Sequence, residues 1–292
     1  MRIARLCLEA GKRALKTAAY SEADEFLRAG VGLISKLSRP WETNYSLGLE
    51  TVTDAAEAAY LNGRQDSALE YVKMVEENAT VVFHKTKAIE TKVHVFLARG
   101  LLGRALEAGL RGVGELGISV PAKIERRHLI YQFIKTKLVV TTTGWRRIEL
   151  LQETKDERFT KIARLFAQMG AATFLNDQLL MAWMIATVTR LSIRKGITPE
   201  SMVFFAGYGQ VLCGRGEIDA GYKFGLLVEK LRQKYPNNES VPTAKFMESF
   251  AIRPWKEHVR KSVEPLSEAY IQGIKNNHLS LIHISEPTRP ST

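Results

Sequence analysis

Residues 58–75 have the sequence A-A-Y-L-N-G-R-Q-D-S-A-L-E-Y-V-K-M-V, which contains the clearest structural pattern of the chain. On either side of Asn62-Gly63, apolar residues recur at steps of three and four, which is the spacing of one face of a helix. Gly63 suits the left-handed conformation in which many helices end, because it lacks a Cβ atom. The stretch therefore predicts a helical hairpin: the end of one helix, a tight polar turn and the start of a second helix.

The same pattern recurs along the chain. Similar stretches begin at Tyr20, Gly100 and Gly214, each with a small or turn-forming residue, a few polar positions and then an alanine that opens an apolar stripe. The alanines at positions 23, 68 and 105 are 45 and 37 residues apart, an irregular spacing of the length expected for tetratricopeptide-like hairpins. We therefore predict an all-α fold, an irregular tetratricopeptide-like helical-hairpin solenoid that spans residues 1–278.

Apolar stripes predict the buried positions of the first three hairpins. Each stripe lies on one side of its helix, so we expect it to be buried against a neighbour. The stripes comprise Ile3, Leu6, Ala10, Ala14 and Ala18, then Ala23, Leu27, Val31 and Ile34; Leu49, Val52, Ala56 and Ala59, then Ala68, Val72, Val75 and Ala79; and Ile89, Val93 and Phe96, then Leu106, Leu110 and Val113. Between the first two hairpins, Pro40 either ends a helix at the residues before it or opens the next one.

The middle of the chain has a less regular pattern. Residues 128–140 predict a helix, whereas V-V-T-T-T-G at 139–144 is rich in β-branched residues, and we interpret it as a frayed helix end followed by a loop. A short helix is expected at 145–151, and another begins at Thr154-K-D-E and runs to Met169. Residues 176–195 form a long apolar helix, which we interpret as a buried core helix rather than a membrane-active one.

The last part of the chain again predicts hairpins. Thr198-Pro199-Glu200 offers a capping hydroxyl, a proline at the first helical position and an early acidic residue, so a helix begins there. It is expected to end at Cys213-Gly214 and to pair with a helix at 219–235. A final hairpin comprises residues 243–253 and 257–276 and turns around Pro254-Trp255.

Residues 279–292 do not continue any stripe. The run L-S-L-I-H-I-S-E-P-T-R within them is similar to the translation of a sequencing adapter. We therefore predict that 279–292 is a non-native tail and leave it out of the functional argument.

Composition and charge narrow the class of protein. The net charge is +11, from 42 basic and 31 acidic residues, and it is interpreted as a solvated surface whose excess is spread along the chain. The two cysteines, Cys7 and Cys213, lie in apolar helical patterns, which favours free thiols in a reducing, cytoplasmic setting. No apolar run reaches the ~18 residues of a membrane span. The basic N-terminus is interpreted as an amphipathic helix and not a signal peptide.

The sequence lacks the motifs of common catalytic sites. A phosphate-binding loop is absent, and the nearest glycine pairs, Gly207 with Gly209 and Gly214 with Gly216, are interpreted as hairpin turns. The histidines at positions 84, 94, 128 and 258 are scattered without metal-ligand spacing. His84 lacks the acidic and proline context of a phosphoacceptor histidine. We therefore predict no catalytic, cofactor-binding or metal-ligating residue in this chain, and no cofactor.

Five stretches together resemble one known family. They are A-Y-L-N-G-R-Q-D-S-A-L-E-Y-V at 59–72, K-T-K-A-I-E-T-K-V-H-V-F-L-A-R-G-L-L-G-R-A-L-E-A-G-L at 85–110, L-G-I-S-V-P at 116–121, Y-G-Q-V-L-C-G-R-G-E-I-D-A-G-Y-K-F-G at 208–225 and P-W-K-E-H-V-R-K-S-V-E-P-L-S-E-A-Y-I-Q-G at 254–273. They resemble the tetratricopeptide-like region of multidomain AAA-ATPase/GAF sensor (hybrid) histidine kinases. In that family the region follows an ATPase module and precedes GAF and output modules. The resemblance implies a kinase parent, but none of the family's ATP-binding or phosphotransfer motifs lies in this chain.

These observations favour a regulatory scaffold over an enzyme. We expect a cytoplasmic helical-repeat segment, without a membrane span, that contacts other domains of its parent protein or a separate protein partner. The alternative is an RNA-binding helical-repeat protein, which the basic charge supports. Repeats that read one base each need a regular period, and the sequence shows none.

Overall fold

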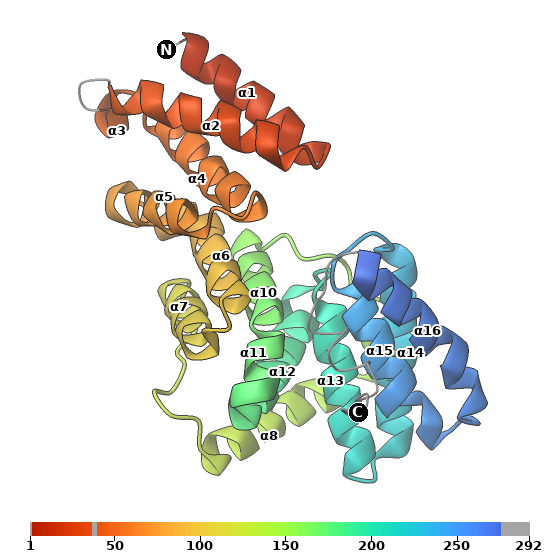
Figure 1. The fold of residues 1–292 in the computed structure, drawn as a ribbon. Coiled ribbons are helices and arrows are strands. Elements are labelled where there is room, and N and C mark those ends of the chain that lie inside the picture. Colours follow the sequence, from red (N-terminus) through yellow and green to blue (C-terminus); the bar gives the residue numbers. More distant parts are fainter. Residues whose placement is uncertain (1, 37–39, 276–292) are drawn as a thin grey trace, which may run out of the picture. The chain divides into compact units, whose positions relative to one another are not determined.

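The computed structural model describes residues 2–36 and 40–275, and these residues form helices joined by short loops (Figure 1). No β-strand occurs in these ranges, where an isolated parallel bridge joins Glu153 and Ile197. The prediction of an all-α fold is confirmed. The chain divides into two compact units, residues 1–120 and 121–292, called here the N-terminal and C-terminal units. The tail at 279–292 lies outside the described residues.

The N-terminal unit consists of three consecutive helical hairpins. Its helices are α1 (Arg2–Lys16), α2 (Tyr20–Ser35), the single-turn α3 (Pro40–Thr43), α4 (Tyr45–Leu61), α5 (Gln65–Asn78), α6 (Val82–Ala98) and α7 (Leu102–Glu115). Pro40 opens α3, where its fixed φ and missing N–H group are tolerated. The predicted hairpins at 3–36, around Gly63 and around Gly100 are therefore all present.

The three hairpins pack in chain order. The second helix of each hairpin contacts the first helix of the next, because α2 packs on α4 and α5 packs on α6. The first helices also contact one another, α1 with α4 and α4 with α6. As a result α1, α4 and α6 lie side by side and form one face of the unit.

Most of the predicted stripes are buried, and the α1 stripe is wrong in part, since its Ala14 is buried but its first two residues are exposed. The α2 stripe from Ala23 to Ile34 and the α5 stripe from Ala68 to Ala79 are buried at every predicted position. In α1, by contrast, Ile3 and Leu6 are 65% and 60% exposed. The face that α1 turns inward carries Ala4, Leu8, Gly11 and Ala14.

Close packing of α1 on α2 explains this choice of face. A Cβ atom at Gly11 would lie 2.4 Å from Cγ of Leu27, so the glycine provides the space into which Leu27 packs. Small residues let the two helix backbones approach, whereas large side chains would hold them apart. The α1 stripe was misassigned because size, and not apolar character alone, selects the buried face.

The turns of successive hairpins are tied together by arginine–aspartate pairs. Gly63 ends the α4 helix at φ = 78°, as predicted, and next to it Arg64 Nη1 lies 2.7 Å from Oδ2 of the buried Asp24 on α2. One hairpin later, Arg99 Nη2 lies 2.6 Å from Oδ1 of Asp66 on α5. Each pair joins a turn to the hairpin before it, and the buried Asp24 makes the first of them the stronger contact, because Asp66 is 90% exposed.

The C-terminal unit contains ten helical segments in its described part, residues 121–275. They are α8 (Arg126–Thr143), α9 (Trp145–Ile148), α10 (Glu157–Gln168), α11 (Gly170–Asn176), α12 (Gln178–Lys195), α13 (Ser201–Gly214), α14 (Ile218–Lys234), α15 (Val241–Ala251), the 3₁₀ helix η1 (Arg253–Trp255) and α16 (Arg260–Lys275). Asp156 and Asp177 cap α10 and α12, because their side chains accept hydrogen bonds from the backbone N–H groups of Phe159 and Leu180. The long α12 is mostly buried, and its Trp183 is 1% exposed.

Helix α8 pairs with α12, although α9, α10 and α11 separate them in sequence (Figure 1). The inserted segment is attached to the α12–α13 loop through two backbone hydrogen bonds, Thr154 N to Ile197 O and Ile197 N to Gln152 O, both 2.9 Å. Gly196 allows this approach at φ = 100°, because a Cβ atom there would lie 2.8 Å from the Gln152 oxygen. The insertion explains the irregular sequence pattern between α8 and α12.

The predicted loop at 139–144 is wrong, because α8 continues to Thr143. Its threonine hydroxyls donate to carbonyls one turn earlier, Thr141 to Lys137 and Thr142 to Leu138, both at 2.8 Å. These bonds satisfy the hydroxyl groups within the helix and so offset the β-branched preference for a strand. The helix ends at Gly144, which has a positive φ of 77°.

Gly207 and Gly209 do not form a hairpin turn, which corrects the sequence interpretation. Both lie inside α13, and Gly209 faces Gly221 of α14. A Cβ atom at Gly221 would lie 2.4 Å from Sγ of Cys213 and 2.6 Å from the Gly209 oxygen. These glycines therefore allow α13 and α14 to pack in close contact. The predicted turn at Gly214 and Gly216 is present, with φ = 84° at Gly216.

Candidate functional site: a charged face of the N-terminal unit

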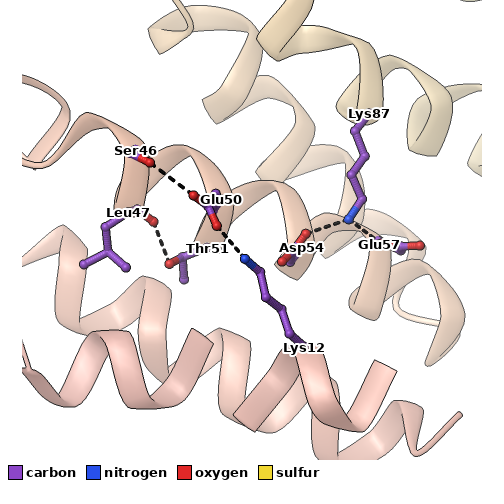
Figure 2. A network of polar contacts seen from close by, with 8 residues as sticks. All are labelled: Lys12, Ser46, Leu47, Glu50, Thr51, Asp54, Glu57 and Lys87. Atoms are coloured by element: carbon purple, nitrogen blue, oxygen red, sulfur yellow. Dashed lines mark hydrogen bonds and ion pairs between the residues drawn. The ribbon is translucent and has the colours of Figure 1, made fainter. Parts of the chain in front are cut away.

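The face formed by α1, α4 and α6 carries a continuous row of charged side chains. It is called here the first-helix face and is defined by Lys12, Ser46, Glu50, Asp54, Glu57 and Lys87 (Figure 2). Helix α4 supplies its serine and its three acidic residues at steps of four, four and three, which places them on one side of the helix. The lysines come from the neighbouring helices on either side, α1 and α6.

The two lysines join the three helices. Lys12 on α1 forms an ion pair with Glu50, which also accepts a hydrogen bond of 3.1 Å from the Ser46 hydroxyl. On the other side of α4, Lys87 Nζ lies 2.6 Å from Oδ1 of Asp54 and 2.7 Å from Oε2 of Glu57 (Figure 2). The first-helix face is therefore held in one arrangement by cross-helix ion pairs.

These contacts change the acidity of two groups. The hydrogen bond from Lys12 lowers the pKa of Glu50, and partial burial opposes this only in part. Burial by itself lowers the pKa of Lys87, but the charges of Asp54 and Glu57 outweigh it and hold the pKa above its ordinary value. Both groups are thus kept charged at neutral pH.

Burial differs along the row. The side chain of Asp54 is only 9% exposed, whereas those of Glu50, Glu57, Lys12 and Lys87 are 39–48% exposed. The Asp54–Lys87 pair therefore fixes the packing of α4 against α6, and the remaining groups offer charge to solvent. A face with exposed charges of both signs on a rigid support suits recognition of a charged protein surface.

The four histidines considered in the sequence are placed apart, each in a local role. Tyr45 and His84 form a hydrogen bond of 2.8 Å between Oη and Nδ1, and His94 lies against the ring of Tyr60. His128 Nδ1 accepts from the backbone N–H group of Glu125 at the start of α8, and His258 does the same for Arg260 before α16. His84 is thus part of the contact between α4 and α6.

The described residues contain no group of three or more histidine, cysteine, aspartate or glutamate side chains that could hold a metal ion. Cys213 is buried and Cys7 half-buried, and neither forms a disulfide. Burial raises the pKa of the Cys213 thiol. Of the helices that the structure describes, none combines the length and the apolar content needed to cross a bilayer.

Sequence reasoning did not identify the first-helix face. The spacing of Ser46, Glu50, Asp54 and Glu57 was available in the sequence, and it predicts a polar stripe on one helix. The spacing does not identify the lysines that pair with these acidic residues, because Lys12 lies 38 residues from Glu50 and Lys87 lies 33 residues from Asp54. No family model, curated protein or solved structure matches the chain.

Proposed function

We propose that this chain is a regulatory scaffold, a tetratricopeptide-like helical-repeat segment of a multidomain signalling ATPase–histidine kinase in the cytoplasm. It holds modules of the parent protein in place, or a separate protein partner, and carries out no reaction of its own. The stretches at 59–72, 85–110, 116–121, 208–225 and 254–273, which resemble that family, support the identity of the parent.

The observation that carries the proposal is the packing order of the N-terminal unit. Each hairpin rests on the next, and the first helices α1, α4 and α6 form one face. Stacked hairpins of this kind present an extended surface to a partner. On that surface, the first-helix face offers charged groups that are already held in place by the Lys12 and Lys87 ion pairs.

Binding is tested by co-purification of the chain with the neighbouring modules of its parent gene. Ser46→Arg places a long cation at the start of the α4 row, one turn before Glu50, and because Ser46 is exposed the fold is expected to persist. We expect this variant to lose the partner, while Glu77→Arg on α5, where the side chain is 60% exposed, retains it. Equal recovery with both variants would show that the partner binds elsewhere.

The absence of catalysis is tested separately with the purified chain. We expect ATP hydrolysis and autophosphorylation at the level of a buffer control. A rate above that control, lost on mutation of a residue in this chain, would make the chain an enzyme and overturn the scaffold proposal.

The second candidate is an RNA-binding helical-repeat protein, and the net charge of +11 is the observation that favours it. Binding through phosphate contacts weakens steeply as salt rises, because counterions are released. Filter binding with single-stranded RNA over a salt series separates the two candidates. Tight binding with a steep salt dependence supports RNA, and weak binding at all salt concentrations supports the protein scaffold.

A further inference from the structure

The outward face of α8 exposes large side chains to solvent. Ile130, Tyr131, Ile134 and Leu138 are 59%, 56%, 62% and 61% exposed. Ile130, Ile134 and Leu138 are four residues apart, so they form one stripe along the helix. Thr136 is the buried residue of this helix. An apolar stripe of this kind is unusual on a helix that is otherwise anchored in the unit.

The inward face of α8 is fixed in place. The Thr136 hydroxyl donates to the Ala186 oxygen of α12 at 2.8 Å, and Phe133 stacks on Tyr208 of α13 with ring centroids 5.7 Å apart. The helix therefore cannot turn its apolar stripe inward without breaking these contacts. The stripe is available to something outside the unit.

Cations flank the stripe, and α8 contains no acidic residue. Arg126 forms no ion pair with another described residue, and Lys135 Nζ lies 4.1 Å from the centre of the Tyr131 ring. Arg127 and Lys137 are paired with Glu125 and Glu217. Two of the four cations on this helix are thus open to an external anion.

The charge of the whole unit has the same sign. Residues 121–278 contain 25 lysines and arginines against 15 aspartates and glutamates, so this part of the C-terminal unit holds +10 of the net charge of +11. The interpretation that the excess is spread along the chain is therefore wrong. A surplus of one sign over a whole unit attracts an extended anionic surface more than a small charged ligand.

We propose that the outward face of α8 docks on an anionic lipid surface, with Ile130, Ile134 and Leu138 at the acyl boundary and the flanking cations among the headgroups. Exposed apolar side chains with cations beside them bind anionic membrane interfaces in this way, and a tyrosine ring suits the interface. The side chains stand on the outer side of a single helix, whereas a partner helix is held best in a groove between elements. The lipids of a bilayer interface can surround an exposed stripe of this kind on all sides, so a lipid surface is the binding partner that the geometry favours.

Vesicle sedimentation with the full chain tests this docking. The probes are phosphatidylcholine vesicles with and without about 30% phosphatidylserine, at low and high salt. We expect binding to the anionic vesicles alone, weaker at high salt because the attraction is screened. Ile134→Asp should reduce binding at least about tenfold, because it removes an apolar group that docking on the lipid surface would bury. Arg126→Gln should reduce it about fivefold.

The matched control is Ile271→Asp on α16, a 51% exposed apolar position of the same unit, which should leave binding unchanged. Circular dichroism checks that each variant is folded. Three results would overturn the proposal: no sedimentation with anionic vesicles, equal loss with Ile271→Asp and Ile134→Asp, or equal binding to neutral vesicles.

Two further results would identify another occupant. If the chain binds RNA but not vesicles, and Ile134→Asp does not weaken RNA binding, the positive charge of the unit serves to bind nucleic acid. If the chain is a dimer that does not bind vesicles, and Ile134→Asp makes it monomeric, the apolar stripe binds a second copy of the chain.

Discussion

At the scale of single residues, helix packing in this protein depends on where side chains are missing. Gly11 accommodates Leu27, and Gly221 accommodates Cys213 and the Gly209 backbone. An alanine at Gly221 would meet a backbone oxygen at 2.6 Å, and a backbone atom cannot move aside as a flexible side chain can. The cost of a methyl group at such a contact comes from overpacking.

Gly221→Ala is therefore expected to destabilise the C-terminal unit by about 1–3 kcal/mol. Gly214→Ala is the matched control, because Gly214 ends α13 and a Cβ atom there meets nothing within 4 Å. It should leave stability unchanged or raise it by about 0.5 kcal/mol. Urea unfolding followed by tryptophan fluorescence measures both changes. Equal stability of the two variants would show that α13 and α14 leave room for a Cβ atom at Gly221.

The two cysteines should differ in reactivity. Cys213 is buried with a raised thiol pKa, and Cys7 is half-buried. Because an accessible thiolate attacks the labelling reagent, we expect one fast labelling event at Cys7 and a second only after unfolding. Mass spectrometry of labelled peptides identifies the sites. Fast labelling of Cys213 in the folded protein would contradict its burial.

At the scale of elements, the sequence predicted hairpin helices well where small and apolar residues share one stripe. The stripes of α2 and α5 are buried at every predicted position. It failed in α1, where Leu27 fits only against Gly11, and in α8, where hydroxyl bonds from Thr141 and Thr142 extend a helix through β-branched residues. Both errors arise from side-chain contacts that the spacing of apolar residues in the sequence does not reveal.

The Asp54–Lys87 pair is the contact between α4 and α6 that we expect to matter most. Lys87→Met leaves Asp54, with a side chain 9% exposed, without its lysine partner, and should destabilise the N-terminal unit by about 2 kcal/mol. The double variant Asp54→Asn with Lys87→Met should recover most of this loss, because the charge that remains without its lysine, on Glu57, is 39% exposed and not buried. Denaturant unfolding followed by circular dichroism compares the three proteins. An identical loss in single and double variants would show that Asp54 does not need the lysine.

The same pair should make the stability difference between wild type and Lys87→Met depend on pH. The pKa of Lys87 in the folded chain is raised above its ordinary value of 10.5. The contribution of the lysine is therefore fully present below about 10.5 and is lost as the pH rises through the folded pKa. We expect a constant difference from neutral pH to about pH 10 and a shrinking one above it. A difference that stays the same at higher pH would argue against the raised pKa.

At the scale of the whole molecule, the prediction of hairpins was correct, but the sequence did not show the insertion that separates α8 from α12. It also did not show the first-helix face, because ion pairs between residues more than thirty positions apart depend on how the hairpins stack. The glycines of the turns mark where the first helix of each hairpin ends, and the local sequence is enough to recognise them. The register between hairpins also involves contacts between distant residues, such as Arg64 with the buried Asp24.

The N-terminal unit should fold without the rest of the chain. Its helices form a compact unit of their own, so residues 1–120 are expected to give a helical circular dichroism spectrum and a cooperative melting transition. The isolated unit also keeps the first-helix face. A spectrum of an unfolded chain would show that this unit needs other contacts to be stable.

We propose above all that the chain is a scaffold segment of a larger signalling protein. The decisive experiment for this proposal is to sequence the full-length transcript on both sides of the region that encodes this chain. We expect an ATPase module with a Walker motif upstream and GAF and phosphoacceptor-histidine motifs downstream. A transcript that lacks both the Walker motif and the phosphoacceptor histidine would contradict it.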